Sequence, residues 1–232
     1  MKPKIIQSGE IPTWLDPTLE NKLDHAFNDL NVSPSERETI ETFLAPLKEK
    51  DIVTLYHYQH CIKVGLLTRK IAEFMHLDQK ELFYAGLLHD IGKSCIDIET
   101  LAKADLRLGG DCIWTQEDAT NMEAHVIEGY NALREKLSFT ADIIVRHHRF
   151  QKNSYPKELP PLPQKYSEGT KVLVDFYARL VALADVYDAF HRVNKKFGTL
   201  VHNSKSQIKD GMLKLNPELG FLVNALYDSE VF

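Results

Sequence analysis

The chain has 232 residues, of which 44% are hydrophobic and 26% charged, and it carries a net charge of -5 at pH 7. This composition is typical of a globular protein, and the acidic balance gives no reason to expect nucleic acid as a partner. No apolar run approaches the roughly 18 residues needed to cross a bilayer, and the N-terminus lacks the apolar stretch of a secretory signal. Three cysteines without a C-x-x-C pair argue against disulfide bonds and a zinc ribbon. We therefore expect a cytoplasmic protein that does not enter the membrane.

Hydrophobic periodicity predicts helices along nearly the whole chain, at residues 17–30, 34–49, 53–76, 78–89, 115–136, 138–149, 170–192, 204–214 and 216–228. Helix starts are indicated by Ser33 before a proline, by Asp78, and by Thr115 with Asp118 three residues later.

The segments between these helices predict the domain organisation. Residues 1–14 look irregular, and the pattern weakens from 97 to 113, where Gly109-Gly110 marks a loop. The stretch Lys152–Gly169 holds four prolines and is expected to form a long loop, of the kind that often borders a functional site. Because no strand pair is apparent, we expect an all-α domain at residues 51–232. Residues 1–50 would form an N-terminal helical extension that packs on it or mediates a homodimer.

The pair His89-Asp90, at the end of an apolar helix, is the first indication of chemistry. Burying an unpaired carboxylate is costly, and a partner charge or a metal ion is the usual relief. Histidine and aspartate together suit a divalent transition metal, with Fe or Mn favoured and Ni or Zn also compatible.

Further histidines and an aspartate interrupt apolar helix faces. His60 shares one face with Val64, Leu67, Ile71 and Phe74, and Asp185 shares one with Val174, Ala178 and Val181. Taken singly, each histidine is more often a satisfied core residue, and Asp185 could simply pair with an arginine. The complete set of candidate ligands is His60, His89, Asp90, His125, His147, His148 and Asp185. A core that gathers all of them without a cation would leave many polar groups unsatisfied. Seven donors exceed the needs of one ion, which favours two ions about 3.5–4 Å apart with Asp90 as the natural bridge.

The order of these ligands resembles the HD-domain metal-dependent phosphohydrolases over roughly residues 50 to 228. The runs His89-Asp90-Ile91-Gly92-Lys93 and Ala184-Asp185-Val186-Tyr187-Asp188-Ala189-Phe190, with the doubled His147-His148, are similar to the HD-GYP branch in particular. The resemblance implies an all-α HD-domain bundle, two metal ions and hydrolysis of a phosphodiester bond. In HD-GYP relatives the substrate is cyclic di-GMP. Here Tyr155-Pro156 of the signature loop is kept, but Ser154 replaces the preceding glycine.

The resemblance also suggests which residues contact a small phosphorylated substrate, such as a nucleotide or a cyclic dinucleotide. Asp90 and Lys93 would be catalytic, with the Lys93 ammonium offsetting charge that develops on the phosphate. Lys93 could instead be a solvated lysine that balances a helix dipole. Arg146, Arg149 and Lys152 could hold further phosphates or be plain surface charge, and Tyr155 completes the predicted substrate-binding set.

Two other readings of the same pattern stay open. HD-fold oxygenases of the inositol-oxygenase-like group resemble the same ligand order and use a two-iron centre to oxidise a C–H bond. A non-catalytic signalling module would keep the fold without the activity, and the altered loop is the feature in its favour.

Overall fold

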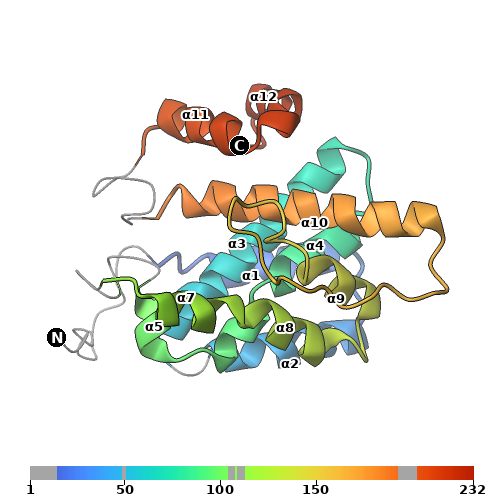
Figure 1. Cartoon of the computed structure of the whole chain (residues 1–232). Helices are drawn as coiled ribbons and strands as arrows, with labels where there is room; N and C mark the ends of the chain where they lie inside the picture. Colours follow the sequence, from blue (N-terminus) through green and yellow to red (C-terminus); the bar gives the residue numbers. More distant parts are fainter. Residues whose placement is uncertain (1–14, 49–50, 104–107, 109–112, 193–202) are drawn as a thin grey trace.

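The computed structural model describes residues 15–48, 51–103, 108, 113–192 and 203–232. Within these ranges every regular element is a helix (Figure 1), which confirms the all-α prediction. None of the described helices is long and apolar enough to cross a membrane. The expectations for residues 1–14 and for Gly109-Gly110 lie outside the described residues.

Two helices at the centre of the fold, α3 (Ile52–Phe74) and α4 (Gln79–Leu88), pack closely against each other. Side chains begin both helices: Asp51 forms a capping box with Thr54, and Asp78 accepts a hydrogen bond of 3.0 Å from the amide of Glu81. A Cβ atom on Gly86 would lie 2.2 Å from Thr68 Oγ1, so only glycine permits this approach. On the predicted stripe of α3, His60, Val64 and Ile71 are buried, Leu67 is partly buried, and Phe74 is 37% exposed.

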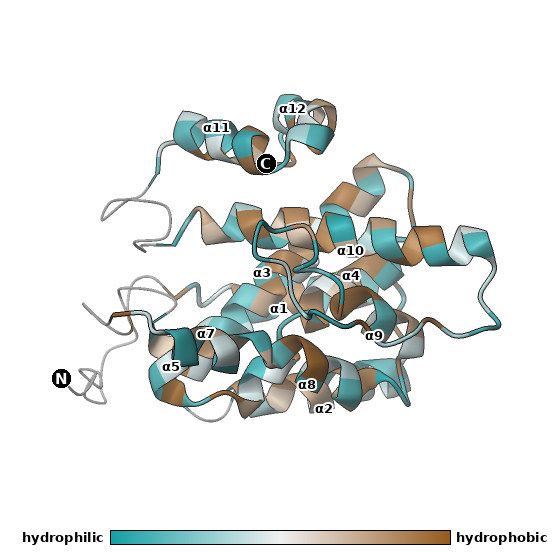
Figure 2. Cartoon of the chain, viewed as in Figure 1, coloured by the Kyte–Doolittle hydropathy of each residue, from teal (hydrophilic) through white to brown (hydrophobic). Residues whose placement is uncertain are grey.

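The long helix α10 (Glu168–Ala189) contacts α3, α4 and α9 (Ser138–Ile144). It also contacts α11 (Lys205–Leu215), and α11 in turn contacts α12 (Gly220–Asp228) (Figure 1). Figure 2 shows hydrophobic and hydrophilic residues alternating along α10 and α11, as expected of amphipathic helices. The predicted loop before α10 is two residues shorter than expected, because Ser167 caps the helix with a hydrogen bond of 3.1 Å from the amide of Thr170.

The N-terminal helices α1 (Leu19–Asp29) and α2 (Pro34–Lys48) pack on α3. Their apolar residues, Leu23, Phe27, Ile40 and Leu47 among them, belong to the same buried core as α3, α4 and α10. The N-terminal helices and the rest of the chain thus share one core. The domain boundary expected at residue 50 stays a prediction.

Two predicted helices break or end next to candidate ligands. The helix expected at 115–136 divides into α7 (Gln116–Glu123) and α8 (His125–Leu133), and the one expected at 138–149 ends at Ile144. At both places backbone amides bond to carbonyls three residues back instead of four, as from Ala124 to Asn121 (3.2 Å) and from His147 to Ile144 (3.3 Å). These tighter turns end the α-helical ladder.

The interruption before α8 fits a close contact with η1 (Ile91–Cys95), the short 3-10 helix that follows α4. A Cβ atom on Gly92 would lie 1.9 Å from the His125 carbonyl oxygen, so glycine is required where the two backbones meet. The short helix α5 (Ile98–Ala102) follows η1.

Candidate metal centre

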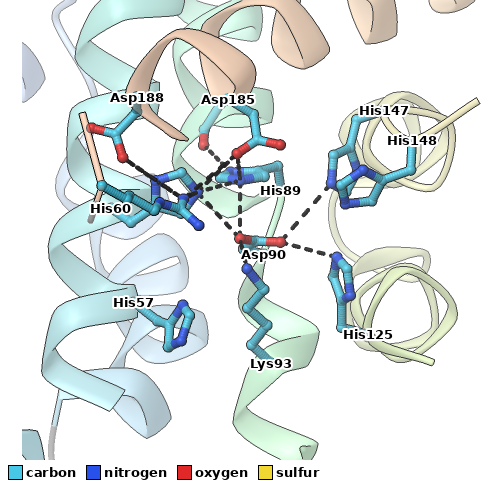
Figure 3. A network of polar contacts seen from close by, with 12 residues as sticks. His57, His60, His89, Asp90, Lys93, His125, His147, His148, Asp185 and Asp188 are labelled. Atoms are coloured by element: carbon cyan, nitrogen blue, oxygen red, sulfur yellow. Dashed lines mark hydrogen bonds and ion pairs between the residues drawn. The ribbon is translucent and has the colours of Figure 1, made fainter. Parts of the chain in front are cut away.

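The seven candidate ligands converge in the interior of the fold (Figure 3). They come from α3, the end of α4, the start of α8, the turn after α9, and α10. Their residues, all at most 9% exposed, are His60, His89, Asp90, His125, His147, His148 and Asp185. The convergence that the sequence predicted is therefore present.

Asp90 lies between two groups of imidazoles. Its Oδ2 atom is 3.3 Å from His60 Nε2 and 3.2 Å from His89 Nε2. Its Oδ1 atom is 3.0 Å from His125 Nε2 and 3.9 Å from His147 Nε2. Each carboxylate oxygen thus faces a different set of nitrogens, which is the arrangement expected of a carboxylate shared by two ions.

The ligand atoms form overlapping sets, each compact enough to surround one cation. One set contains Asp90, His125, His147 and His148; a second contains His60, His89 and Asp90; a third contains His89, His147 and Asp185, with the atoms of each set within 4.8 Å of one another. We call the first set, which Asp90 joins through Oδ1, the His125 half. The opposite side, formed by His60, His89, Asp185 and Asp90 Oδ2, is called the His60 half.

Unsatisfied polar atoms show that a cation fits this pocket. Among the described residues, the buried atoms Asp90 Oδ1, His125 Nε2 and His147 Nε2 have no hydrogen-bond partner. Leaving buried polar atoms unpaired is unfavourable, and a metal ion on the His125 half would satisfy all three. Its nitrogen-rich donors suit a divalent transition metal.

Three of the histidines are oriented by backbone carbonyl oxygens. His89 Nδ1 donates to the Gly86 carbonyl at 2.7 Å and His147 Nδ1 to the Ile144 carbonyl at 2.5 Å; His125 Nδ1 contacts the Met122 carbonyl in the same way. Because a carbonyl only accepts, each Nδ1 carries the hydrogen, and the lone pair of the neutral ring is on Nε2. The Nε2 atoms are the ones that face Asp90, so these rings are already in the tautomer that binds a metal.

Charges in the pocket shift several pKa values in opposite directions. Burial alone would raise the pKa of Asp90, but His89, Lys93 and His125 hold that pKa well below its usual range. Burial, with the neighbouring His89, lowers the pKa of His147 to about 3. Burial and Arg192 oppose protonation of His60, yet its hydrogen bonds with carboxylates raise its pKa to about 9. The His147 ring is therefore neutral over a wide pH range, whereas His60 holds its proton in the absence of a metal.

Asp188 and Arg192 also belong to this centre, although the sequence analysis assigned them no role. Asp188 Oδ2 accepts a hydrogen bond of 2.7 Å from His60 Nδ1. Arg192 Nη2 lies 2.8 Å from both ring nitrogens of His60. Asp188 could have been found, because it stands three residues after Asp185 and therefore on the same helix face. Arg192 follows the end of α10, where helical spacing no longer predicts which way a side chain points.

The predicted substrate-binding residues occupy different environments. Lys93 is only 6% exposed and donates to Asp90 Oδ2 at 2.5 Å, so it is not a solvated helix-end lysine. The Tyr155 ring lies 4.3 Å from the His148 ring, at the edge of the His125 half. Arg146 is buried and donates to the carbonyls of Asp142 (2.6 Å) and Pro160 (3.2 Å), contacts that hold the loop after α9.

Arg149 and Lys152 are exposed. Arg149 lies 3.7 Å from Asp175 Oδ1, and that side chain is itself half exposed. His57 is buried near Leu101, with its Nε2 atom 3.4 Å from that carbonyl oxygen, and it joins none of the ligand sets. This placement agrees with its omission from the predicted ligands.

A family model described as the HD domain matches residues 57–189, more than half of the chain. The chain therefore belongs to the HD domain family, and all seven candidate ligands fall within the matched region. No curated protein matches the sequence. Membership of this family, together with the buried His/Asp cluster, indicates a metal-dependent hydrolase.

Proposed function

We propose that this protein hydrolyses a phosphate ester with two divalent metal ions that share Asp90. The observation that carries the proposal is the position of Asp90, whose two oxygens face imidazoles of opposite halves at 3.0 to 3.3 Å. His125, His147 and His148 would hold one ion, and His60, His89 and Asp185 the other. When bound, such ions lower the pKa of a shared water and polarise the phosphoryl oxygens.

Lys93 supplies the charge that the chain itself brings to the reaction. Its ammonium is buried beside Asp90, at the centre where a phosphate would bind. A preorganised positive charge in a dry pocket stabilises negative charge that develops on the phosphoryl oxygens. We expect iron or manganese as the metal, because both accept mixed imidazole and carboxylate donors.

The substrate class proposed is a small phosphodiester, with a cyclic dinucleotide as the specific candidate. Tyr155 supports this choice, because its ring lies 4.3 Å from the His148 ring and brings an aromatic side chain to the centre. Aromatic faces stack on nucleobases. The HD-GYP assignment and cyclic di-GMP itself rest on the sequence resemblance. The cytoplasmic location rests on the cysteine pattern and a homodimer on residues 1–50, and both stay proposals.

Metal analysis followed by a substrate panel tests the proposal. The purified protein is loaded with Fe²⁺ or Mn²⁺ without oxygen, its metal content is measured, and it is offered bis(p-nitrophenyl) phosphate, cyclic dinucleotides, linear dinucleotides and nucleotide monophosphates. We expect close to two ions per chain and anaerobic hydrolysis of a phosphodiester.

Lys93→Ala should keep near-normal metal content and lose about 10²–10³-fold in kcat, whereas Lys214→Ala, an exposed control on α11, should change neither. Full loading without hydrolysis, together with substrate-dependent oxygen uptake, would replace the proposal with the oxygenase reading. Failure to bind metal would favour a non-catalytic module.

A further inference from the structure

Arg192 brings a buried positive charge to one half of the centre. Its side chain is 10% exposed, and Nη2 lies 2.8 Å from His60 Nε2, the atom that would bind a metal. The same Nη2 atom is 3.8 Å from Asp185 Oδ1 and 3.7 Å from Asp188 Oδ2. Arg192 Nε is buried and has no hydrogen-bond partner among the described residues. The guanidinium is thus held in the pocket by charge more than by a complete set of hydrogen bonds.

The two halves of the centre differ in the cations that they already contain. On the His60 half, Asp90 Oδ2 is paired with Lys93, and Asp185 faces Arg192. On the His125 half, Asp90 Oδ1 is buried without a hydrogen-bond partner among the described residues. The carboxylates of the His60 half therefore lie beside a lysine or an arginine, whereas Asp90 Oδ1 on the His125 half faces only imidazoles, with His125 Nε2 at 3.0 Å and His147 Nε2 at 3.9 Å.

An ion in the His60 half would meet the guanidinium at short range. Bound to His60 Nε2 at about 2.1 Å, it could lie no farther than about 5 Å from Nη2 in its present position, since that atom is 2.8 Å from the same nitrogen. Like charges at this separation in a buried site repel strongly. Filling the His60 half therefore requires the guanidinium to move aside.

We propose that Arg192 makes the two halves unequal, standing in for the ion of the His60 half so that this half fills second and more weakly than the His125 half. The inference rests on the two-ion centre of the proposed function and adds an order of loading to it. An enzyme built in this way is fully assembled only when metal is abundant, because one ion remains bound while the other exchanges.

Mn²⁺ titration of the metal-free full chain tests this order without any measurement of activity. Calorimetry gives the two affinities, and electron paramagnetic resonance distinguishes a single bound Mn²⁺ from a magnetically coupled pair. In the unmodified protein we expect affinities that differ at least tenfold, with the uncoupled signal up to one equivalent. Equal affinities, or a coupled signal from the start of the titration, would overturn the inference.

Neutral variants then identify Arg192 as the cause. Arg192→Gln should tighten the second affinity at least tenfold and change the first less than threefold, and Arg192→Met, which keeps an apolar stem, should do the same. Arg149→Gln is the matched control, because Arg149 is exposed and follows His148 directly. It should leave both Mn²⁺ affinities unchanged. Variants that leave the second affinity unchanged or weaken it would refute the role of Arg192.

The outcome is independent of hydrolysis. Unequal loading that Arg192→Gln equalises, in a protein that cleaves no phosphodiester, would sustain this inference and defeat the proposed function. A chain that binds no Mn²⁺ would defeat both.

Discussion

Replacement of Asp90 by asparagine is the sharpest test of the centre, because it removes a charge while nearly preserving shape. Without metal, the buried Lys93 ammonium donates to Asp90 Oδ2 at 2.5 Å, and both side chains are at most 8% exposed. Removing one partner of a buried ion pair leaves an uncompensated charge and costs about 3–5 kcal/mol. The asparagine oxygen still accepts one hydrogen bond, so we expect the lower end of this range. For a chain of this size, about 3 kcal/mol corresponds to a fall in Tm of roughly 6–12 °C.

The assay is thermal unfolding in excess chelator, so that metal binding does not contribute. Asp90→Asn should unfold about 6–12 °C below the unmodified protein, and the double variant Asp90→Asn/Lys93→Met should recover most of the loss. Asp210→Asn, at an exposed position of α11, controls for the loss of a carboxylate alone. An Asp90→Asn protein as stable as the unmodified chain would refute the conclusion that the pair is buried and mutually dependent.

Metal content separates the shared carboxylate from the other ligands. Because its two oxygens face different halves, Asp90→Asn should reduce bound Mn²⁺ from about two ions to none. His148→Ala should leave about one, because His148 joins only the set of the His125 half. Retention of one tightly bound ion by Asp90→Asn would show that Asp90 does not serve both halves.

Three further predictions address the surroundings of the centre. Asp188→Asn should weaken one of the two bound ions about 10–100-fold, measured by Mn²⁺ titration. Gly92→Ala should destabilise the fold by more than about 3 kcal/mol in urea unfolding, since its Cβ would lie 1.9 Å from the His125 carbonyl; Gly169→Ala, at an open position, should not. Hydrogen bonds, the largest from Lys103, lower the pKa of Asp118 to about 2. In unfolding measurements, the stability that the unmodified chain has over Asp118→Asn should thus be complete above pH 4 and shrink as the pH falls toward 2.

The candidate ligands other than His60 and Asp185 came from short runs such as His89-Asp90 and from the order that resembles the HD-domain family. Periodicity located most of the helices and placed His60 and Asp185 on apolar faces, because a polar residue on an apolar face is visible in a single sequence. It placed His125 in mid-helix and His147-His148 at a helix end, whereas the helices are interrupted or ended before these residues. The interruption before His125 coincides with a backbone contact to Gly92 that joins segments more than 30 residues apart, and no local pattern contains it. Arg192 was missed for a similar reason, since its role depends on contact with His60, a residue 132 positions away in the sequence.

The helix ends explain how the ligands are oriented. The last carbonyls of a helix have no helical partner, and three ligands use them: His89, His125 and His147 each direct Nδ1 to a carbonyl three residues back, in the final turn of α4, α7 or α9. A histidine placed there fixes its own tautomer without help from another side chain.

His60 lies within α3, where the carbonyls are already paired, and it therefore depends on the Asp188 carboxylate. The hydrogen bonds with carboxylates raise the pKa of His60. The Asp188 carboxylate also lies 3.7 Å from Arg192 Nη2, which offsets its negative charge. The position of His60 within α3 thus accounts for the additional charges on its half. On this argument, the effect of Asp188→Asn should fall on the ion that binds second and leave the first untouched.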